Sequence, residues 1–287
     1  MNGILLIDKQ AGMTSRDVVN CVVKKLDLKR IGHTGTLDPL ATGVLVVCVG
    51  EATKVVELLT SLEKEYIAEV TLGIKTDTLD ITGNVLDSVD VSINEEDIIK
   101  VLNSFKGKYM QEVPIYSAVK VNGKKLYEYA RDGIDVNLPK REVEIKNIDY
   151  LGLSKRDNQW CFSFKCLVSK GTYIRSLIKD ICDKLNTVGC MSSLRRTKQG
   201  KFRIEDCIKI DDVSNNRLLD IKDVLDIPKI EVDDYLKNKI SNGQILENRY
   251  DSDLIMYIYQ DQVLAIYRVK DDDKTKVKPY KMFGGIK

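Results

Sequence analysis

The side chains best suited to chemistry lie in one short segment, residues 32–43, which reads Gly-His-Thr-Gly-Thr-Leu-Asp-Pro-Leu-Ala-Thr-Gly. It carries His33, the single histidine of the chain, and the carboxylate Asp38. An ionised carboxylate can act as a nucleophile or as a general base. The glycines and threonines bury little apolar surface, so we expect a loop rather than a core element. An Asp-Pro dipeptide is most often a turn, so a turn and a reactive carboxylate are both open interpretations of Asp38.

The sequence lacks the motifs of several large enzyme classes. It contains no phosphate-binding G-x-x-x-x-G-K-[ST], no dinucleotide-binding G-x-G-x-x-G, no H-E-x-x-H and no G-x-S-x-G. The single histidine and the absence of any C-x-x-C pair disfavour a metal site. We therefore expect chemistry that uses no metal and no cofactor.

Size, cysteine count and hydropathy indicate the number of domains and the cellular compartment. The chain has 287 residues, 43% of them hydrophobic and 31% charged, which fits one large domain or two ordinary ones. Seven cysteines, an odd number, predict reduced thiols rather than a disulfide framework. The longest uninterrupted apolar run, residues 44–49, is too short to span a bilayer, and the N-terminus is too short of apolar residues for a signal peptide. We expect a cytoplasmic protein without membrane contact.

The net charge of +2 hides a strong local asymmetry. Residues 165–203 hold ten Lys or Arg against two Asp, whereas residues 205–235 hold ten Asp or Glu against four Lys or Arg. A concentrated basic segment can bind a polyanion even when the global charge is near zero. The alternative is a solvated basic helix face that the acidic neighbour neutralises. Charge alone favours the second interpretation.

The hydrophobic patterns predict an α+β fold. Alternation and short apolar runs predict strands at residues 4–7, 44–49, 66–72, 160–168, 254–259 and 263–269. Helical spacing predicts a first helix that is capped by Thr14 or Ser15 and includes residues 18–26. It predicts further helices at residues 51–59, 95–105, 172–185 and 232–240. Because the strands are not separated by regular helices, we expect a mostly antiparallel mixed sheet with packed helices. Pro228 marks a candidate boundary, followed by about 60 residues that could form a small β-rich module.

The complete segment 32–43 resembles the catalytic motif of the bacterial tRNA pseudouridine-55 synthases, the TruB family, which reads G-H-x-G-x-L-D-P-x-A-x-G. Every fixed position of that motif is matched. Four further segments are similar to family motifs in the same order, at residues 64–73, 114–120, 170–177 and 194–196. The resemblance covers residues 3–205 well and the C-terminal part loosely. It departs from the family at Gln10, where proline is usual, and at Pro114, which stands alone where two prolines are common.

This resemblance implies a fold, an activity and a partner. The fold is the pseudouridine synthase fold, with a catalytic domain at residues 1–227, a mobile RNA-contacting insertion at 117–145, and a PUA-like RNA-binding module at 228–287. The activity is isomerisation of uridine 55 in the T-loop of tRNA, by base flipping and attack of an aspartate. The partner is tRNA, contacted at its T-arm and acceptor stem by a monomer.

The resemblance also assigns roles to residues. Asp38 is the nucleophile that attacks C1′ or C6, Arg175 holds it in its ionised form, and Tyr66 stacks on the base and helps to remove the C5 proton. A buried cation fits this chemistry because burial otherwise favours the neutral carboxyl. The residues assigned to substrate binding are His33, Tyr66, Tyr173, Leu194, Lys9, Arg195 and Arg196. Within this family's geometry, Arg195, Arg196, Lys198 and Lys201 face phosphates. Without the resemblance, a core-facing ring is the better interpretation of Tyr66.

Two alternatives come from other functional classes. The first is a non-catalytic RNA-binding or tRNA-folding protein, which needs neither Asp38 nor Arg175. The second is a hydrolase with an aspartate nucleophile, such as a glycosidase. A glycosidase normally pairs its nucleophile with a second carboxylate as general acid, and residues 32–43 contain none.

Overall fold

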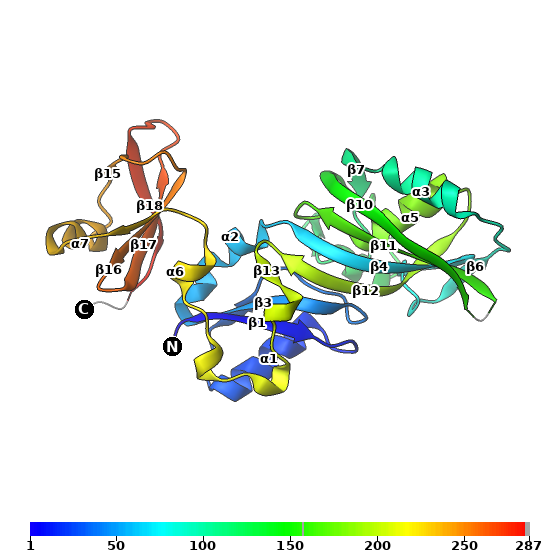
Figure 1. The fold of residues 1–287 in the computed structure, drawn as a ribbon, viewed down its shortest axis with the longest axis horizontal. Helices are drawn as coiled ribbons and strands as arrows, with labels where there is room; N and C mark the ends of the chain where they lie inside the picture. Colours follow the sequence, from blue (N-terminus) through cyan, green and yellow to red (C-terminus); the bar gives the residue numbers. More distant parts are fainter. Residues whose placement is uncertain (157, 285–287) are drawn as a thin grey trace.

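A large mixed sheet forms most of the molecule (Figure 1). The computed structural model describes residues 1–156 and 158–284. Within them, the order of strands across the sheet is β1 (Gly3–Lys9), β3 (Thr42–Val49), β12 (Gly189–Gln199), β4 (Lys64–Leu72), β11 (Gln159–Val168), β10 (Lys140–Arg156) and β7 (Gly107–Glu112). Two short strands flank this path, β2 (Ile31–His33) on β3 and β13 (Phe202–Arg203) on β12. Every pairing is antiparallel except that of β12 with β3. The expected α+β fold with a mostly antiparallel sheet is confirmed.

Strands β1 and β3 are buried on both faces, which explains their uninterrupted apolar sequences. One face, with Leu5 and Leu45, packs against helix α1 (Ser15–Leu26). The other face, with Ile4 and Val44, packs against the 3-10 helix η1 (Gly50–Val55) and helix α2 (Val56–Thr60). The single α-helix predicted at residues 51–59 is therefore wrong in type, since its first half has the tighter 3-10 geometry.

Strands β4, β11 and β10 bury one face beneath helices α3 (Glu95–Asn103) and α5 (Ile174–Lys184). Phe162, Phe164 and Cys166 alternate along β11 into this core, as the sequence predicts. Helix α3 begins where expected because the Asn94 side chain accepts a hydrogen bond from the N–H of Asp97. Helix α5 begins with Tyr173 at its N-cap, so Arg175 stands in its first turn.

Two further predicted segments differ from the structure. The loop expected at residues 32–43 begins inside β2 and ends inside β3, because both ends pair with strands of the sheet. The basic residues of segment 165–203 do not lie on one helix face, because the segment is divided among β11, α5, β12 and β13. The interpretation of that segment as a solvated helix face is therefore wrong.

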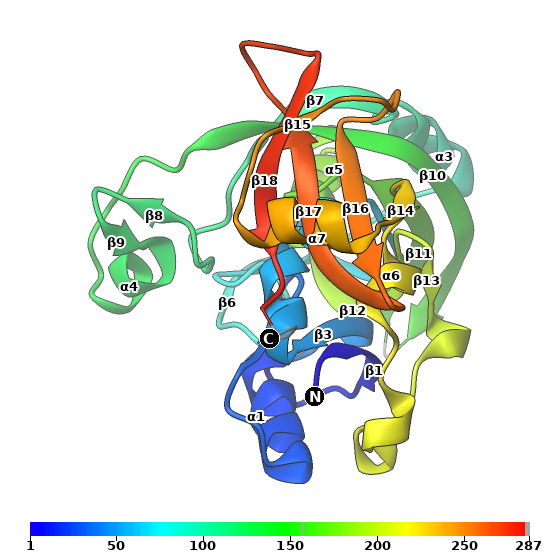
Figure 2. The ribbon, with the colours of Figure 1, turned by 90° about the vertical axis from the view of Figure 1, so that its left-hand side faces the viewer.

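The insertion predicted at residues 117–145 contains a small lobe that projects from the main body (Figure 2). The lobe consists of β8 (Lys120–Val121), β9 (Lys124–Lys125) and helix α4 (Leu126–Arg131). From Lys140 onward the chain pairs with β7 in the large sheet, so the predicted range extends too far. Residues 140–145 pair with β7 because the alternating side chains of Val143 and Ile145 are buried in the sheet.

The C-terminal part of the chain forms a second sheet at one end of the molecule (Figures 1 and 2). Its strands follow the order β14 (Lys229–Glu231), β16 (Leu254–Tyr259), β17 (Gln262–Val269), β18 (Lys276–Met282) and β15 (Leu246–Glu247), with helix α7 (Asp234–Ser241) beside them. Met256 and Ile266 pack in the same apolar cluster as Leu59 of α2. The second sheet is therefore joined to the first through a shared core.

The remaining short elements connect these parts. They are the hairpin strands β5 (Ile74–Thr76) and β6 (Val85–Ser88), the 3-10 helices η2 (Ile204–Asp206), η3 (Ile210–Asp212) and η4 (Asn215–Arg217), and helix α6 (Ile221–Val224). Across residues 1–156 and 158–284, the helices all fall short of the length and apolar character that a membrane crossing requires.

The parallel contact between β3 and β12 depends on Gly43. This residue pairs with Arg196 and has a φ of 101°, in the region that disfavours side chains. A Cβ atom at Gly43 would lie 2.2 Å from the carbonyl oxygen of Arg196. The two strands can approach each other only because no side chain is present here.

We predict that Gly43→Ala destabilises the protein far more than Gly107→Ala does. Gly107 has a similar φ of 104°, but a Cβ there meets nothing within 4 Å. Gly107→Ala therefore carries only the backbone strain, about 1–2 kcal/mol, whereas Gly43→Ala adds a collision between the new Cβ atom and the backbone of Arg196. Urea unfolding of both variants measures the difference, and equal losses would contradict this role of Gly43.

Candidate active site

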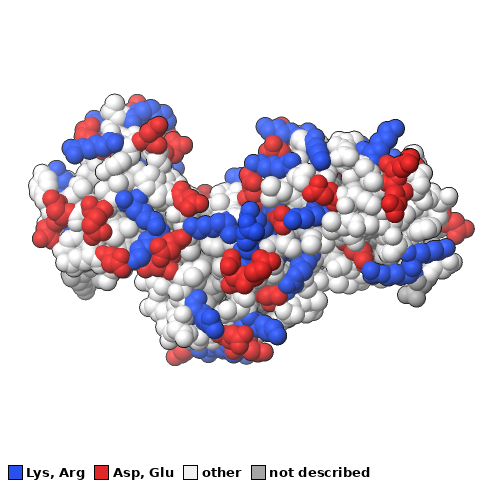
Figure 3. Space-filling model, in the orientation of Figure 1, with Lys and Arg blue, Asp and Glu red and all other residues white. Residues whose placement is uncertain are grey.

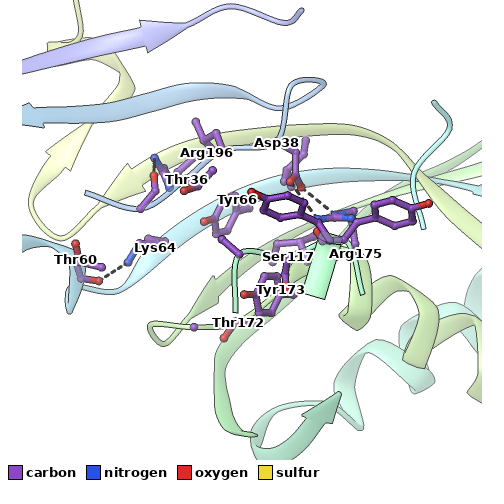
Figure 4. A pocket seen from close by; sticks show the side chains of 18 residues that line it. Thr36, Asp38, Thr60, Lys64, Tyr66, Ser117, Thr172, Tyr173, Arg175 and Arg196 are labelled. Atoms are coloured by element: carbon purple, nitrogen blue, oxygen red, sulfur yellow. Dashed lines mark hydrogen bonds and ion pairs between the residues drawn. The ribbon is translucent and has the colours of Figure 1, made fainter. Parts of the chain in front are cut away.

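A cavity of about 470 Å³ opens where β4, β12 and the N-terminal end of α5 meet the loop after β2 (Figure 4). Its wall comes from segments that are far apart in the sequence. The lining residues are Gly35, Thr36, Leu37, Asp38, Thr60, Lys64, Tyr66, Tyr116, Ser117, Ala118, Tyr127, Gly171, Thr172, Tyr173, Ile174, Arg175, Leu194 and Arg196.

Asp38 and Arg175 form a bidentate ion pair in this cavity (Figure 4). Nε of Arg175 donates to Oδ2 of Asp38 at 3.0 Å, and Nη2 donates to Oδ1 at 3.1 Å. The arginine side chain is 6% exposed and the aspartate side chain 32% exposed. The carboxylate is thus held in a fixed orientation while part of it faces the open cavity.

Two backbone carbonyls fix the other side of the Arg175 guanidinium. Nη1 donates to the carbonyl oxygen of Thr78 at 2.9 Å, and Nη2 donates to that of Tyr116 at 3.0 Å. With the bonds to Asp38, these contacts engage four of the five N–H donors of the group. Arg175 therefore connects the Asp38 loop to two other loops around the cavity.

The backbone on both sides of Asp38 is anchored to the N-terminal segment. The hydroxyl of Ser15, which is buried at the start of α1, accepts from the N–H of Leu37 at 2.9 Å and donates to its carbonyl at 3.3 Å. The N–H of Gly12 donates to the carbonyl of Pro39 at 2.9 Å. These contacts hold the reactive loop against the sheet.

Lys9 is buried, and its role differs from the expected contact with substrate. Its Nζ donates to the carbonyl oxygens of Gln10, Pro39 and Ala41, at 2.9, 3.3 and 2.6 Å. Burial lowers the pKa of Lys9 to about 8, although the nearby Asp38 carboxylate opposes this shift. Because its three N–H donors are used by the protein, Lys9 stabilises the loop instead of facing a ligand.

Arg195 and Arg196 point to opposite sides of β12, as adjacent strand residues do. Arg195 is partly exposed outside the cavity and makes a bidentate pair with Asp8, at 2.9 and 3.2 Å. Arg196 is fully buried in the cavity wall, where Nε donates to the carbonyl of Val44 at 2.6 Å and Nη2 to that of Gly35 at 3.2 Å. The sequence predicts a phosphate contact for Arg196 as for Arg195, but the structure places Arg196 in the wall of the cavity and not on the outer surface.

Tyr66 lines the cavity, whereas His33 does not. The Tyr66 side chain is 7% exposed and belongs both to the cavity wall and to the core. Burial raises the pKa of its phenol, an effect that the Arg196 guanidinium opposes. His33 lies outside the wall, and its buried Nδ1 has no hydrogen-bond partner in the described part of the chain. Burial, with the charge of nearby Arg16, lowers the pKa of His33.

Tyr173 and Leu194 are both in the wall, as expected. The backbone of Tyr173 is clamped by the fully buried side chain of Gln111. Oε1 of Gln111 accepts from the Tyr173 N–H at 2.8 Å, and Nε2 donates to its carbonyl at 3.1 Å. This clamp fixes the point at which α5 begins, and with it the position of Arg175.

Sequence reasoning did not assign roles to several residues of the wall. Lys64 and Ser117 both occur in segments that match family motifs, which is the signal that could have identified them. The buried hydroxyl of Ser117 has no hydrogen-bond partner among the described residues. The carbonyls of Thr78 and Tyr116 leave no trace in the sequence, because any residue type supplies a carbonyl.

Comparison with known proteins places this chain among the pseudouridine synthases. The family model "TruB family pseudouridylate synthase (N terminal domain)" matches residues 23–174, and "tRNA pseudouridylate synthase B C-terminal domain" matches residues 175–236. The chain therefore belongs to the TruB family of pseudouridylate synthases.

Relatives and a solved structure agree with that assignment. The chain is 45% identical over 259 residues to tRNA pseudouridine synthase B of Bacillus subtilis (strain 168), covering 86% of this chain and 84% of that protein. It is 41% identical over 302 residues to tRNA pseudouridine synthase B of Staphylococcus aureus (strain Newman), covering 98% and 99%. A chain in the crystal structure of a Cbf5-Nop10-Gar1 complex matches with a TM-score of 0.72 at 26% identity, over 98% of this chain and 84% of that one.

We predict that Ser15→Ala destabilises the protein by about 1–3 kcal/mol, because it leaves the buried N–H and carbonyl of Leu37 without this partner. Ser176→Ala is the matched control, since Ser176 is also buried but makes no side-chain hydrogen bond within the described residues. Its loss should be smaller. Thermal or urea unfolding checks the order, and equal effects would contradict the anchoring role of Ser15.

Proposed function

We propose that this protein isomerises uridine 55 in the T-loop of tRNA to pseudouridine, with Asp38 as the nucleophile. The observation that carries the proposal is the bidentate pair of Asp38 and Arg175 inside a cavity that Tyr66 also lines. Membership of the TruB family and the names of its relatives support the same reaction.

The reaction is an isomerisation and needs no external reactant. The bond between C1′ and N1 breaks, the uracil turns, and a bond forms between C5 and C1′. The proton on C5 is lost and N1 carries a proton in the product, so atoms and electrons balance. Asp38 provides the carboxylate that attacks C1′ or C6 and leaves again. No cofactor has a step in this scheme.

Arg175 orients the Asp38 carboxylate and compensates its charge while the base occupies the cavity. Burying a carboxylate is costly unless a cation lies beside it, and the planar guanidinium supplies that cation with two N–H donors in fixed positions. The two carbonyls behind Arg175 prevent it from turning away. The pair is therefore formed before the substrate arrives, which limits the reorganisation needed during reaction.

Tyr66, Tyr173 and Leu194 form the walls for the uracil. A base that leaves its stack costs a few kcal/mol, and contact with an aromatic ring recovers about 1–3 kcal/mol. Tyr66 also takes part in removal of the C5 proton. Burial raises the pKa of its phenol, and the neighbouring Arg196 guanidinium opposes that shift only in part.

The surface of the protein that binds tRNA includes side chains outside the cavity. Arg195, Lys198 and Lys201 contact phosphates near the T-arm, and His33 contacts the T-loop beside the flipped nucleotide. On the face drawn in Figure 3, basic and acidic side chains are interspersed and do not form one uniform basic patch.

The domain roles complete the proposal. Residues 1–227 form the catalytic domain, and the lobe with α4 is a mobile RNA contact whose Tyr127 already lines the cavity. Residues 228–287 form a PUA-like module that contacts the acceptor stem. The protein acts as a monomer in the cytoplasm.

We predict that Asp38→Asn abolishes formation of pseudouridine while the protein stays folded, because the amide keeps the shape but is no nucleophile. Glu51→Gln is the control, since it neutralises another acid paired with an arginine, Arg30, outside the cavity. Pseudouridine at position 55 of a T-arm transcript is the readout. Persistent turnover in Asp38→Asn would remove Asp38 from this role, and retained function in cells would favour the tRNA-folding alternative.

We predict that Tyr66→Leu lowers turnover while it spares binding of the RNA, because most of the binding energy comes from contacts outside the cavity. Tyr66→Phe keeps the ring without the hydroxyl and separates stacking from proton removal. Release of tritium from RNA that carries 5-tritiated uridine measures the proton step, and filter binding measures affinity. Equal losses of affinity and turnover in Tyr66→Leu would argue for a purely structural tyrosine.

A further inference from the structure

The wall of the cavity contains a further charged group, Lys64, which the proposed mechanism does not use. Lys64 lies at the start of β4, on the other side of Tyr66 from the pair of Asp38 and Arg175 (Figure 4). Its Nζ donates to the carbonyl oxygens of Thr60 and Leu62, at 2.9 and 2.7 Å. The third N–H of the ammonium group has no partner among the described residues.

Lys64 and Arg196 are two buried cations that approach the same backbone. A methyl group at Gly35 would lie 3.5 Å from Nη1 of Arg196 and 3.5 Å from Cε of Lys64. Lys64 is 7% exposed and Arg196 fully buried. Within residues 1–156 and 158–284, neither of them forms an ion pair with a carboxylate, and the nearby Lys170 adds a further positive charge.

Backbone carbonyls satisfy the hydrogen bonds of these cations but leave their charge uncompensated. Burying a cation is costly unless an anion lies close to it. Burial, followed by the charges of Arg196 and Lys170, lowers the pKa of Lys64 to about 8. An anion that enters the cavity would reduce the free-energy cost of burying these two cations. This end of the cavity therefore favours binding of a negatively charged group.

We propose that Lys64, with Arg196 behind it, binds a backbone phosphate next to the nucleotide that enters the cavity. The inference rests on the proposed function, in which the ligand is RNA and its available anion is the phosphodiester. The arrangement of the wall fits this ligand. In the proposed mechanism Asp38 faces the sugar and base, and Lys64 lies on the far side of Tyr66 from Asp38. Lys64 is thus a binding residue that sets how far the nucleotide enters.

A purely structural role for Lys64 is the competing explanation. Lysines often bind the free carbonyls at the end of a helix, and Thr60 is the last residue of α2. In that case Lys64 would be important for folding, but the effect of removing a phosphate charge on RNA binding would not depend on Lys64. The two explanations are separated by changing the phosphate rather than the protein.

The test uses T-arm hairpins in which a single phosphate, on the 5′ or the 3′ side of the target uridine, is replaced by a neutral methylphosphonate. Equilibrium binding is measured in the Asp38→Asn background, so that the RNA stays unconverted. With Lys64 present, one of the two methylphosphonates should weaken binding about tenfold. With Lys64→Met, the same methylphosphonate should have almost no effect, because the contact is already lost.

The matched control is Lys100→Met, which removes an exposed lysine of α3. Its effect and that of each methylphosphonate should add independently. If Lys64→Met does not fold, Lys64→Gln serves instead, since it keeps a donor for the carbonyls without the charge. Methylphosphonate effects that are the same with and without Lys64 would overturn the proposal.

The same set of reagents separates failure of this inference from failure of the proposed function. Conversion of unmodified hairpin by the unsubstituted protein reports on the function alone. Loss of sensitivity to methylphosphonate in the Lys64 variants reports on the phosphate contact alone. A protein that converts the hairpin but shows additive effects would retain the function and lose the phosphate site.

Discussion

The ion pair between Asp38 and Arg175 is the contact on which the rest of the site depends. Its two residues are separated by 137 positions in the chain, and the same guanidinium also binds the carbonyls of Thr78 and Tyr116. One nearly buried side chain therefore joins four segments. Because a buried guanidinium without its carboxylate would be costly, correct closure of these loops and correct placement of the acid occur together.

The sheet supplies the frame for that pair. Strand β12 lies between β3 and β4, and its parallel contact with β3 requires the bare backbone of Gly43. This arrangement brings Arg196 into the cavity wall and leaves Arg195 outside it. On the other side, the Gln111 clamp fixes the start of α5 and thereby Arg175. Rigid elements thus position each charged group, which suits a site that must not reorganise during reaction.

The cations around the cavity are held in two different ways. Arg175 has a carboxylate partner, whereas Lys9, Lys64 and Arg196 are held by backbone carbonyls. Carbonyl oxygens complete the hydrogen bonds of a cation but cancel little of its charge. The cavity therefore keeps an excess of positive charge beside one carboxylate, which is the electrostatic character expected of a site for a polyanion such as RNA.

The sequence by itself determined the class of fold, the family and the short motifs that meet in the cavity. Alternation along β11 and the start of α3 are local properties, so the sequence predicts them directly. The loop with Asp38 was identifiable because its glycines and its Asp-Pro pair fit no core element. The helix at residues 51–59 and the end of the insertion were predicted less well, because a 3-10 turn and a strand that starts late depend on packing.

Only the tertiary structure decided what each cation does. Lys9, Arg195 and Arg196 have similar side chains, and the sequence assigned all three to the substrate. Strand alternation places Arg195 and Arg196 on opposite faces of β12. Lys9 is buried, and its ammonium group donates to backbone carbonyls of the loop that contains Asp38. Carbonyl partners belong to the backbone and have no residue signature, so contacts such as those of Arg175 with Thr78 and Tyr116 exist only once distant segments have packed together.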